Sequence, residues 1–461
     1  MSDLFSMLGV AARALDAQRY GLDVTGQNIA NVNTPGYARR SIELAEVPPL
    51  DSRSAGGGVD VLAVRAARAS LIEARLRSEN PAASREGAVA DKLSVVETGL
   101  GQPGASLDAA LTRFYNTYGA LAQSPTSGVA RQQVIVEGRS LAQSFNNIAA
   151  QLSTSARDAD AEIRDDVQQV NALAEQIAGL NGAIVGSTGL PPEAARDQQS
   201  VALASLAQLI DISVAQRTDG GIDVSIGHGR ALVVGQNAYA VTATSSGAQG
   251  FAAIISDGAD VPTNITAEIS GGRIAGLLQV RDVLVPGYGN RLDQLAYGVV
   301  TDVNALAQSG YDLTSAAGTA FFVQPLSAAG AARLMSVSST VAADTNLVVA
   351  AGAPSPGNND IARKIAALQD ASITGTQTRP VDAWGDLVYR VSADTRTALE
   401  ERDAHEQVAH QLESLRDQIS GVSLDEEAAM LMRFQRAYEA NAKFFSIVNQ
   451  TLDMLMDTVR R

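Results

Sequence analysis

The stretch "GVSLDEEAAMLMRFQRAYEANAKFFSIVNQTLDMLMDTV", Gly421 to Val459, decides the fold. Mostly apolar residues recur in it at alternating steps of three and four positions. They are Leu424, Ala428, Leu431, Gln435, Tyr438, Ala442, Phe445, Asn449, Leu452, Leu455 and Val459. This spacing averages about 3.5 residues, which is the period of a coiled-coil seam. The stretch therefore predicts a long helix that packs against a partner helix.

The start of the chain repeats the same spacing. Its positions are Leu4, Leu8, Ala11, Leu15, Gln18, Leu22, Thr25, Ile29 and Val32. Two seams at opposite ends predict that a first helix, about Asp3 to Asn28, pairs with the last one. The periodicity alone also fits two amphipathic helices on an ordinary globular core.

The composition limits the classes of protein to which the chain can belong. The 461 residues allow about three domains. The chain is 46% hydrophobic, only 4% aromatic and contains 40 glycines, which is unusual for a large enzyme. The net charge of −15 disfavours nucleic acid as a partner, and the absence of cysteine excludes disulfides, thiolate catalysis and zinc–sulfur sites. No cleavable signal is visible, and every apolar run falls well short of the about 20 residues needed to span a membrane, so we expect no membrane partner.

The end of the first predicted helix carries an unusual motif. Three asparagines, Asn28, Asn31 and Asn33, precede Thr34, Pro35, Gly36 and Tyr37. Asparagine and glycine tolerate left-handed backbone, and proline disfavours helix in the residue before it, so a helix ends here and an extended segment, Ala38 to Glu46, follows.

This motif is part of a longer resemblance. "LDVTGQNIANVNTPGYAR", Leu22 to Arg39, closely resembles the N-terminal motif of bacterial flagellar rod, hook and hook-associated proteins. The Gly421–Val459 stretch is similar to their C-terminal motif. "SLDEEAA" at its start, residues 121–146 and residues 270–322 resemble the hook-associated protein 1 family in particular. That family commonly has glutamine at Arg40, histidine at Gln308 and a glycine near Ser315. We expect little consequence at Arg40, which we place at an exposed helix exit.

The whole pattern predicts a mainly α protein with an inserted β-domain. Residues 1–40 and 421–461 are expected to form a terminal coiled-coil stalk. Residues 41–209, 271–310 and 361–420 are expected to form an antiparallel helical bundle, with a break near Pro81 and separate helices Val129 to Leu152 and Ala156 to Leu180. Alternating apolar residues between glycine-rich turns predict an outer antiparallel β-domain of residues 210–270 and 311–360.

No catalytic, cofactor or metal site is expected. The acidic group Asp158, Asp160, Glu162, Asp165 and Asp166 spreads around a helix and is interpreted as a solvated face. Gly227 to Arg230 is a hairpin turn rather than a phosphate-binding loop, because no helix pattern follows it. His405 and His410 are five residues apart, so their imidazoles diverge by about 140° and cannot grip one ion together. The sequence therefore favours a structural protein over an enzyme.

A stalk two helices thick buries too little apolar surface, at roughly 25 cal/mol per Å², to offset its ordering entropy. We therefore expect its helices to be loosely ordered in the free subunit and to order when copies assemble. The expected assembly interface consists of Leu4, Leu8, Leu15, Leu22, Asn28, Ile29, Asn31, Asn33, Pro35, Gly36, Tyr37, Leu424, Leu431, Tyr438, Phe445, Leu452 and Leu455.

The resemblance implies the rest of the function. It implies an extracellular structural subunit of the bacterial flagellum that self-assembles into a ring or helical zone between the hook protein and the next hook-associated protein. It also implies type III export after a transient cytoplasmic stage with an export chaperone, for which Phe434, Tyr438, Phe444 and Phe445 are candidate contacts. Two alternatives stay open: another flagellar axial subunit of the hook or rod, and a soluble helical adaptor protein.

Overall fold

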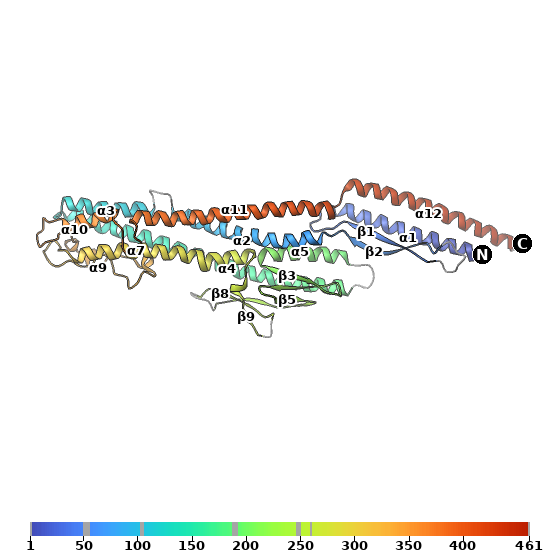
Figure 1. Cartoon of the computed structure of the whole chain (residues 1–461), viewed down its shortest axis with the longest axis horizontal. Coiled ribbons are helices and arrows are strands. Elements are labelled where there is room, and N and C mark those ends of the chain that lie inside the picture. Colours follow the sequence, from blue (N-terminus) through green and yellow to red (C-terminus); the bar gives the residue numbers. More distant parts are fainter. Residues whose placement is uncertain are drawn as a thin grey trace.

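The chain folds into a long helical rod with both ends of the chain at one end of the rod and a β region along one side (Figure 1). The computed structural model describes residues 2–48, 56–101, 106–186, 192–245, 250–258 and 261–459. The predicted fold class, mainly α with an inserted antiparallel β region, is confirmed.

Long helices form the body of the rod. They are α2 (Ser70–Leu100), α3 (Leu107–Gln123), α4 (Gly128–Val185), α5 (Glu193–Leu209), α6 (Gly272–Gln279), α7 (Val285–Gln308), α10 (Asp360–Ala367) and α11 (Pro380–Ser420), with a π-helical turn at Val280–Leu284 between α6 and α7. Ser127 caps α4 by accepting a hydrogen bond from the Ala130 amide, and proline at the first position of α11 has no amide to leave unpaired.

Two predicted helix breaks are wrong. The two helices expected on either side of Ser153 to Ser155 are one helix, α4, whose 58 residues span about 87 Å. Leu152, Ala156 and Ile163 continue one buried stripe through the polar residues, so nothing interrupts the packing. Pro81 lies inside α2, where it is buried against the Gly271 loop. Packing of α2 along α11 holds the helix together at the proline.

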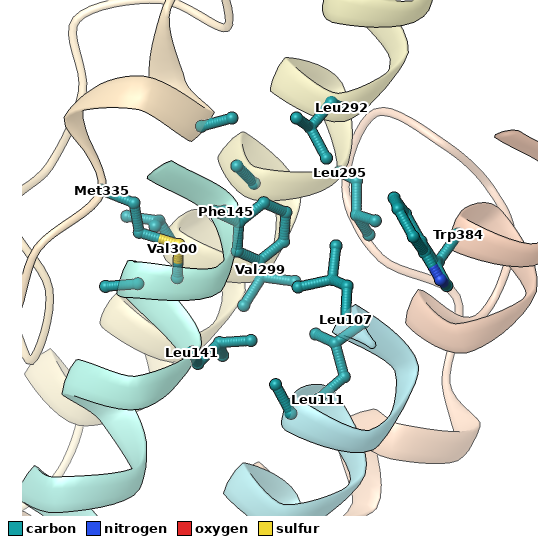
Figure 2. Packing of buried hydrophobic residues seen from close by; sticks show 14 of the residues in the cluster. Leu107, Leu111, Leu141, Phe145, Leu292, Leu295, Val299, Val300, Met335 and Trp384 are labelled. Atoms are coloured by element: carbon teal, nitrogen blue, oxygen red, sulfur yellow. The ribbon is translucent and has the colours of Figure 1, made fainter. Parts of the chain in front are cut away.

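The larger hydrophobic core fills the end of the rod far from the termini. It combines residues of α2, α3, the first half of α4, α7, α10 and the first half of α11. Figure 2 shows Phe145 of α4 surrounded by Leu295, Val299 and Met335, with Trp384 of α11 closing one side. This core makes the distal part of the body rigid.

The β region consists of two small antiparallel sheets against the second half of α4. One sheet has the order β3–β4–β5–β6 and the other β7–β8–β9. The strands are β3 (Ile212–Gln216), β4 (Ile222–Ile226), β5 (Arg230–Val234), β6 (Asn237–Ala238), β7 (Val241–Ser245), β8 (Ala252–Ser256) and β9 (Thr263–Asn264). Their inward residues join α4, α5 and α6 in a second core. The turn at Gly227 to Arg230 joins β4 to β5, which confirms the predicted hairpin turn.

The second predicted β segment, residues 311–360, is wrong. It contains isolated bridges and two short helices, α8 (Ala331–Leu334) and α9 (Ser339–Ala343), and it packs on the distal core rather than on the sheets. Side chains of the long helices make hydrogen bonds to the backbone of this segment, in place of the bonds that neighbouring strands would make. Asn304 of α7 both donates to and accepts from the backbone of Phe322, and Asn146 of α4 donates to the Ala332 carbonyl. A short helical turn at Asp344 to Val348 and a loop then lead into α10.

One boundary of the predicted bundle is also wrong. Residues after position 40 form a hairpin of β1 (Arg40–Glu46) and β2 (Val59–Ala66) that lies along the first helix, α1 (Ser2–Ala30), and not in the bundle. Val10 of α1 approaches Gly58, and Arg13 donates to the Gly57 carbonyl over 2.8 Å. The rest of the division into three domains stays a prediction.

Candidate functional site

The two terminal helices lie side by side at the end of the rod (Figure 1). α12 (Leu424–Val459) contacts α1 along its length, and the β1–β2 hairpin packs on another side of α1. We call these four elements the stalk. Among the residues that the structure describes, neither hydrophobic core contains a side chain of the stalk. The stalk is therefore a thin structure without a core of its own.

Small residues of α1 allow the close approach of α12. The buried positions at steps of three and four are Ala17, Gly21, Val24 and Asn28. A Cβ at Gly21 would lie 2.6 Å from Phe434 of α12, so only glycine fits under this ring. A cavity of about 180 Å³ remains between α1, β1 and α12. The contact is close at Gly21 but incomplete around it.

The buried positions of the two helices coincide with the predicted seam at Ala11, Thr25 and Leu452, and at most other points they are displaced from it by about one residue. On α12, Glu427 and Phe434 contact α1, and Val448 and Leu452 are buried further along the helix. Of the predicted α12 residues, Leu452 is buried and Leu431 and Phe445 are half-buried, whereas Leu424, Tyr438 and Leu455 are exposed. On α1, Leu4, Leu8, Leu15, Leu22 and Ile29 are half-buried. Several predicted interface residues are thus outside the helix pair.

Large apolar side chains of the stalk are exposed to solvent, most of them on α12, and we call this exposed surface of the two helices the outer face of the stalk. They are Phe5, Met7, Leu424, Met432, Tyr438, Phe444, Ile447, Met454, Leu455 and Met456. Ile447 is 60% exposed and Met454 67% exposed in the free subunit. Exposed apolar residues gathered on one element mark an interaction surface. Of the four aromatic residues predicted to contact a chaperone, Tyr438 and Phe444 are on this face, Phe445 is half-buried and Phe434 covers Gly21.

Asn28 organises the base of the stalk. It is 1% exposed, and its Nδ2 donates to the Arg40 carbonyl and to Oε2 of Glu427, over 2.9 and 3.0 Å. Its Oδ1 accepts from the Tyr37 hydroxyl and the Arg40 amide, over 2.8 and 3.0 Å. One amide side chain therefore joins the end of α1, the start of β1 and the start of α12.

Glu427 completes this junction from the other chain end. It is 2% exposed, and its Oε1 accepts from Nε of Arg39 over 2.7 Å. Arg39 also pairs with Glu426, and its backbone amide donates to the Ser420 carbonyl over 2.8 Å. Burial raises the pKa of Tyr37, and although Arg40 opposes this effect, Asp197 and Glu427 add to it, so the tyrosine stays a neutral donor to Asn28. The SLDEEAA and NTPGYAR motifs therefore meet in one network of hydrogen bonds and ion pairs at the base of the stalk.

The other residues of the N-terminal motif shape the turn. Asn31 donates to the Gln27 carbonyl and accepts from the Thr34 hydroxyl, which ends the helix. Gly36 has φ +76° and lies against Val201 of α5, where a Cβ would be 2.4 Å from Cγ2, so both the backbone and the space require glycine. Asn33 and Pro35 are exposed.

Sequence reasoning missed a second set of contacts at the junction. Arg40 was expected to be exposed and inconsequential, but its side chain is only 13% exposed and pairs with Asp197 of α5 over 2.8 Å. Its guanidinium carbon also lies 4.8 Å from the centre of the Tyr37 ring. Because 157 positions separate Arg40 from Asp197, no local pattern could have paired them.

The prediction of a solvated face for the acidic group of α4 is wrong in part: Asp158 and Asp165 are exposed, but the other three carboxylates are buried or half-buried. Asp160 and Asp166 are buried, and Asp160 pairs with Arg281 over 2.7 Å and with Arg164 over 3.0 Å. Burial acts to raise the pKa of Asp160, but hydrogen bonds from the Ala252 amide, Arg164 and Arg281 outweigh it and lower the pKa. Glu162 pairs with Lys92 and Arg273. These carboxylates fasten β8 and α6 to α4, and the described residues include no group of three His, Cys, Asp or Glu placed to hold a metal.

Family models match three parts of the chain. A model of flagella basal body rod proteins matches residues 8–37, and the C-terminal model of flagellar basal body rod FlgEFG proteins matches residues 416–458. The FlgK helical-domain model of flagellar hook-associated proteins matches residues 93–322. The two end matches cover most of α1, the turn after it and nearly all of α12, so the two helices of the stalk are the part that resembles basal body rod proteins.

Curated relatives match the chain from end to end. Flagellar hook-associated protein 1 of Bacillus subtilis is 26% identical, with 99% of each chain covered. Its namesakes in Salmonella typhimurium and Escherichia coli are 23% and 24% identical, with 98% of this chain and 99% of theirs covered. The chain belongs to the flagellar hook-associated protein 1 family.

A solved structure agrees with this assignment at the level of the fold. The flagellar hook junction protein FlgK from Burkholderia pseudomallei superposes with a TM-score of 0.68 over 75% of this chain and 100% of that chain, at 14% identity. The hook-associated protein 1 family is a family of structural flagellar proteins, so the stalk belongs to an axial protein that assembles with hook and filament components. Among the described helices, none is long and apolar enough to cross a membrane.

Proposed function

We propose that this chain is the structural subunit that joins the hook of the bacterial flagellum to its filament, and that copies of it assemble through their terminal helices. The observation that carries the proposal is the coreless stalk, which presents large apolar side chains on its outer face. The family relatives and the junction-protein fold support the same function.

The partners follow from the position of the subunit in the flagellum. The outer face of α12 would be covered first by a neighbouring copy of the chain. The ends of the ring or helical zone would contact the hook protein on one side and the next hook-associated protein on the other. Buried apolar area at about 25 cal/mol per Å² then supplies the stabilisation that the free stalk lacks.

The proposal also includes the export route by which the subunit reaches the flagellum. A chain with no cysteine to form a disulfide, and with a thin stalk, can be threaded unfolded through a type III export channel. A cytoplasmic chaperone would cover α12 beforehand, with Tyr438 and Phe444 as its exposed aromatic contacts. The working location is the outside of the cell, in the flagellum. We propose a structural role without catalysis.

A strain lacking this chain tests the proposal. It should build hooks without attached filaments and release filament protein into the medium. Complementation with a double variant, Ile447→Ser with Met454→Ser, should fail to restore filaments although the purified variant unfolds like the parent, because both residues contact solvent in the free subunit. The control is Asp158→Asn on the exposed surface of α4. Normal filaments in the deleted strain would contradict the proposal.

A further inference from the structure

The stalk and the helical body meet with very little shared surface. In the part of the chain that the structure describes, no helix or strand of the stalk packs extensively on a helix of the body. Neither hydrophobic core continues across the boundary. The angle between the two parts is therefore not set by apolar packing.

Two backbone connections cross the boundary, and both lie close together. Ala67 to Ala69 lead from β2 into α2, and Gly421 to Ser423 lead from α11 into α12. Backbone hydrogen bonds tie them, from the Arg39 amide to the Ser420 carbonyl and from the Ala67 amide to the Arg39 carbonyl, each 2.8 Å long. Two neighbouring connections alone would allow the stalk to rotate about the line that joins them.

A third point of attachment is on α5, a helix of the body to which neither connection leads directly. Asp197 of α5 accepts from Arg40 of β1 at one oxygen, over 2.8 Å, and from Arg68 of the β2–α2 connection at the other, over 2.6 Å. Figure 1 shows α5 beginning near β1 and β2, below the turn from α11 to α12. One carboxylate of the body thus holds two separate parts of the chain that leads into the stalk.

The side chains of this ion pair are largely buried, so water cannot easily take the place of either partner. The side chains of Arg40 and Asp197 are 13% and 10% exposed. The Nε atoms of Arg40 and Arg68 are buried without a hydrogen-bond partner, so each arginine depends on its remaining nitrogens for pairing. Removing one partner of a poorly hydrated pair leaves an uncompensated charge. Without Asp197, Arg68 would share Glu193 with Arg196, and Arg40 would keep Gln27 as its hydrogen-bonded side-chain partner.

We propose that Asp197 is a positioning residue that fixes the orientation of the stalk relative to the helical body through its simultaneous pairing with Arg40 and Arg68. The pairing acts in the free subunit. It goes beyond the proposed function, because it holds whatever the subunit assembles with.

Distance measurement between two spin labels tests this directly. The chain has no cysteine, so cysteines introduced at Leu62 of β2 and Gln176 of α4, both exposed, give two unique labels on the full-length subunit. Pulsed electron paramagnetic resonance on the parent should give one narrow distance distribution. Asp197→Asn should broaden the distribution and shift its mean, and Arg40→Gln should do so as well.

The controls separate orientation from folding. Asp158→Asn makes the same change of charge on the exposed surface of α4 and should leave the distances unchanged. The melting temperature of the body, followed by circular dichroism, should stay close to that of the parent in Arg40→Gln, since Arg40 is outside both cores. If Asp197→Asn does not fold, Arg40→Gln decides alone. A distribution for Arg40→Gln that superimposes on the parent would overturn the inference.

Discussion

Replacing Asn28 with alanine should open the base of the stalk without unfolding the body. The side chain makes four hydrogen bonds, two to Arg40 backbone atoms, one to Glu427 and one from Tyr37. Alanine removes all four and leaves the buried Glu427 with Arg39 as its remaining hydrogen-bonded side-chain partner. Asn28 belongs to neither hydrophobic core, so both cores should be unaffected.

The size of the effect follows from these contacts. A buried hydrogen bond contributes about 0.5–1.5 kcal/mol net, so four contribute about 2–6 kcal/mol. The lower half of this range is expected, because water enters the opened junction and hydrates the freed groups. A loss of about 3 kcal/mol raises the equilibrium constant of local opening roughly 100-fold.

Hydrogen exchange measures that constant. The Arg39 and Ala67 amides donate across the junction, so peptides containing them should exchange roughly 100-fold faster in Asn28→Ala than in the parent. The matched control is Asn33→Ala, which changes an exposed asparagine of the same motif and should have no effect. Equal exchange of these peptides in Asn28→Ala and the parent would refute the assigned role of Asn28.

Three further variants test other parts of the structure. Gly21→Val places a Cβ 2.6 Å from Phe434 and should weaken the pairing of α1 with α12 by about 1–3 kcal/mol. The expected result is faster hydrogen exchange in the middle of α12. The control is Gly9→Val, which has open space around it and should leave this exchange unchanged. Asp160→Asn breaks the pair with Arg281 and should lower the free energy of unfolding of the body in urea by about 3 kcal/mol. The pKa of Asp160 is lowered in the folded protein. Its contribution to the stability of the fold is therefore present above the unfolded pKa of about 4 and is lost as pH falls through the folded pKa. The parent should consequently lose stability in acid more steeply than this variant. Ser315→Gly should raise the melting temperature by relieving φ +64°, a gain of about 1 kcal/mol, and a lower melting temperature would refute this.

The pairing of the chain ends could be predicted from the sequence, but its register could not. The periodicity of apolar residues identifies the two helices. It places their seam at large apolar residues such as Leu22 and Tyr438. The contact is actually made by Gly21 and Phe434, because the smallest residue admits the closest approach. The large predicted residues of α1 are half-buried, and several of those of α12 are exposed to solvent.

Long-range polar contacts were the least predictable part. Charge patterns cannot tell a solvated carboxylate from a buried one when its partner is more than one hundred positions away, as Arg281 is from Asp160. The same holds for Arg40 and Asp197. The sequence also does not show that a side chain will bind a distant backbone segment. The pattern of residues 311–360 therefore predicts strands, although hydrogen bonds from Asn304 and Asn146 hold parts of this segment as loops.

The central claim is that the stalk is completed by neighbouring copies and is loosely held before assembly. Hydrogen exchange by mass spectrometry on the free subunit tests it most directly, comparing residues 4–20 and 435–458 with the middle of α4. The account predicts fast exchange at both stalk tips beside a protected α4, with protection rising toward Asn28 and Glu427. Exchange at both tips as slow as in α4 would contradict it, since the stalk would then be folded on its own.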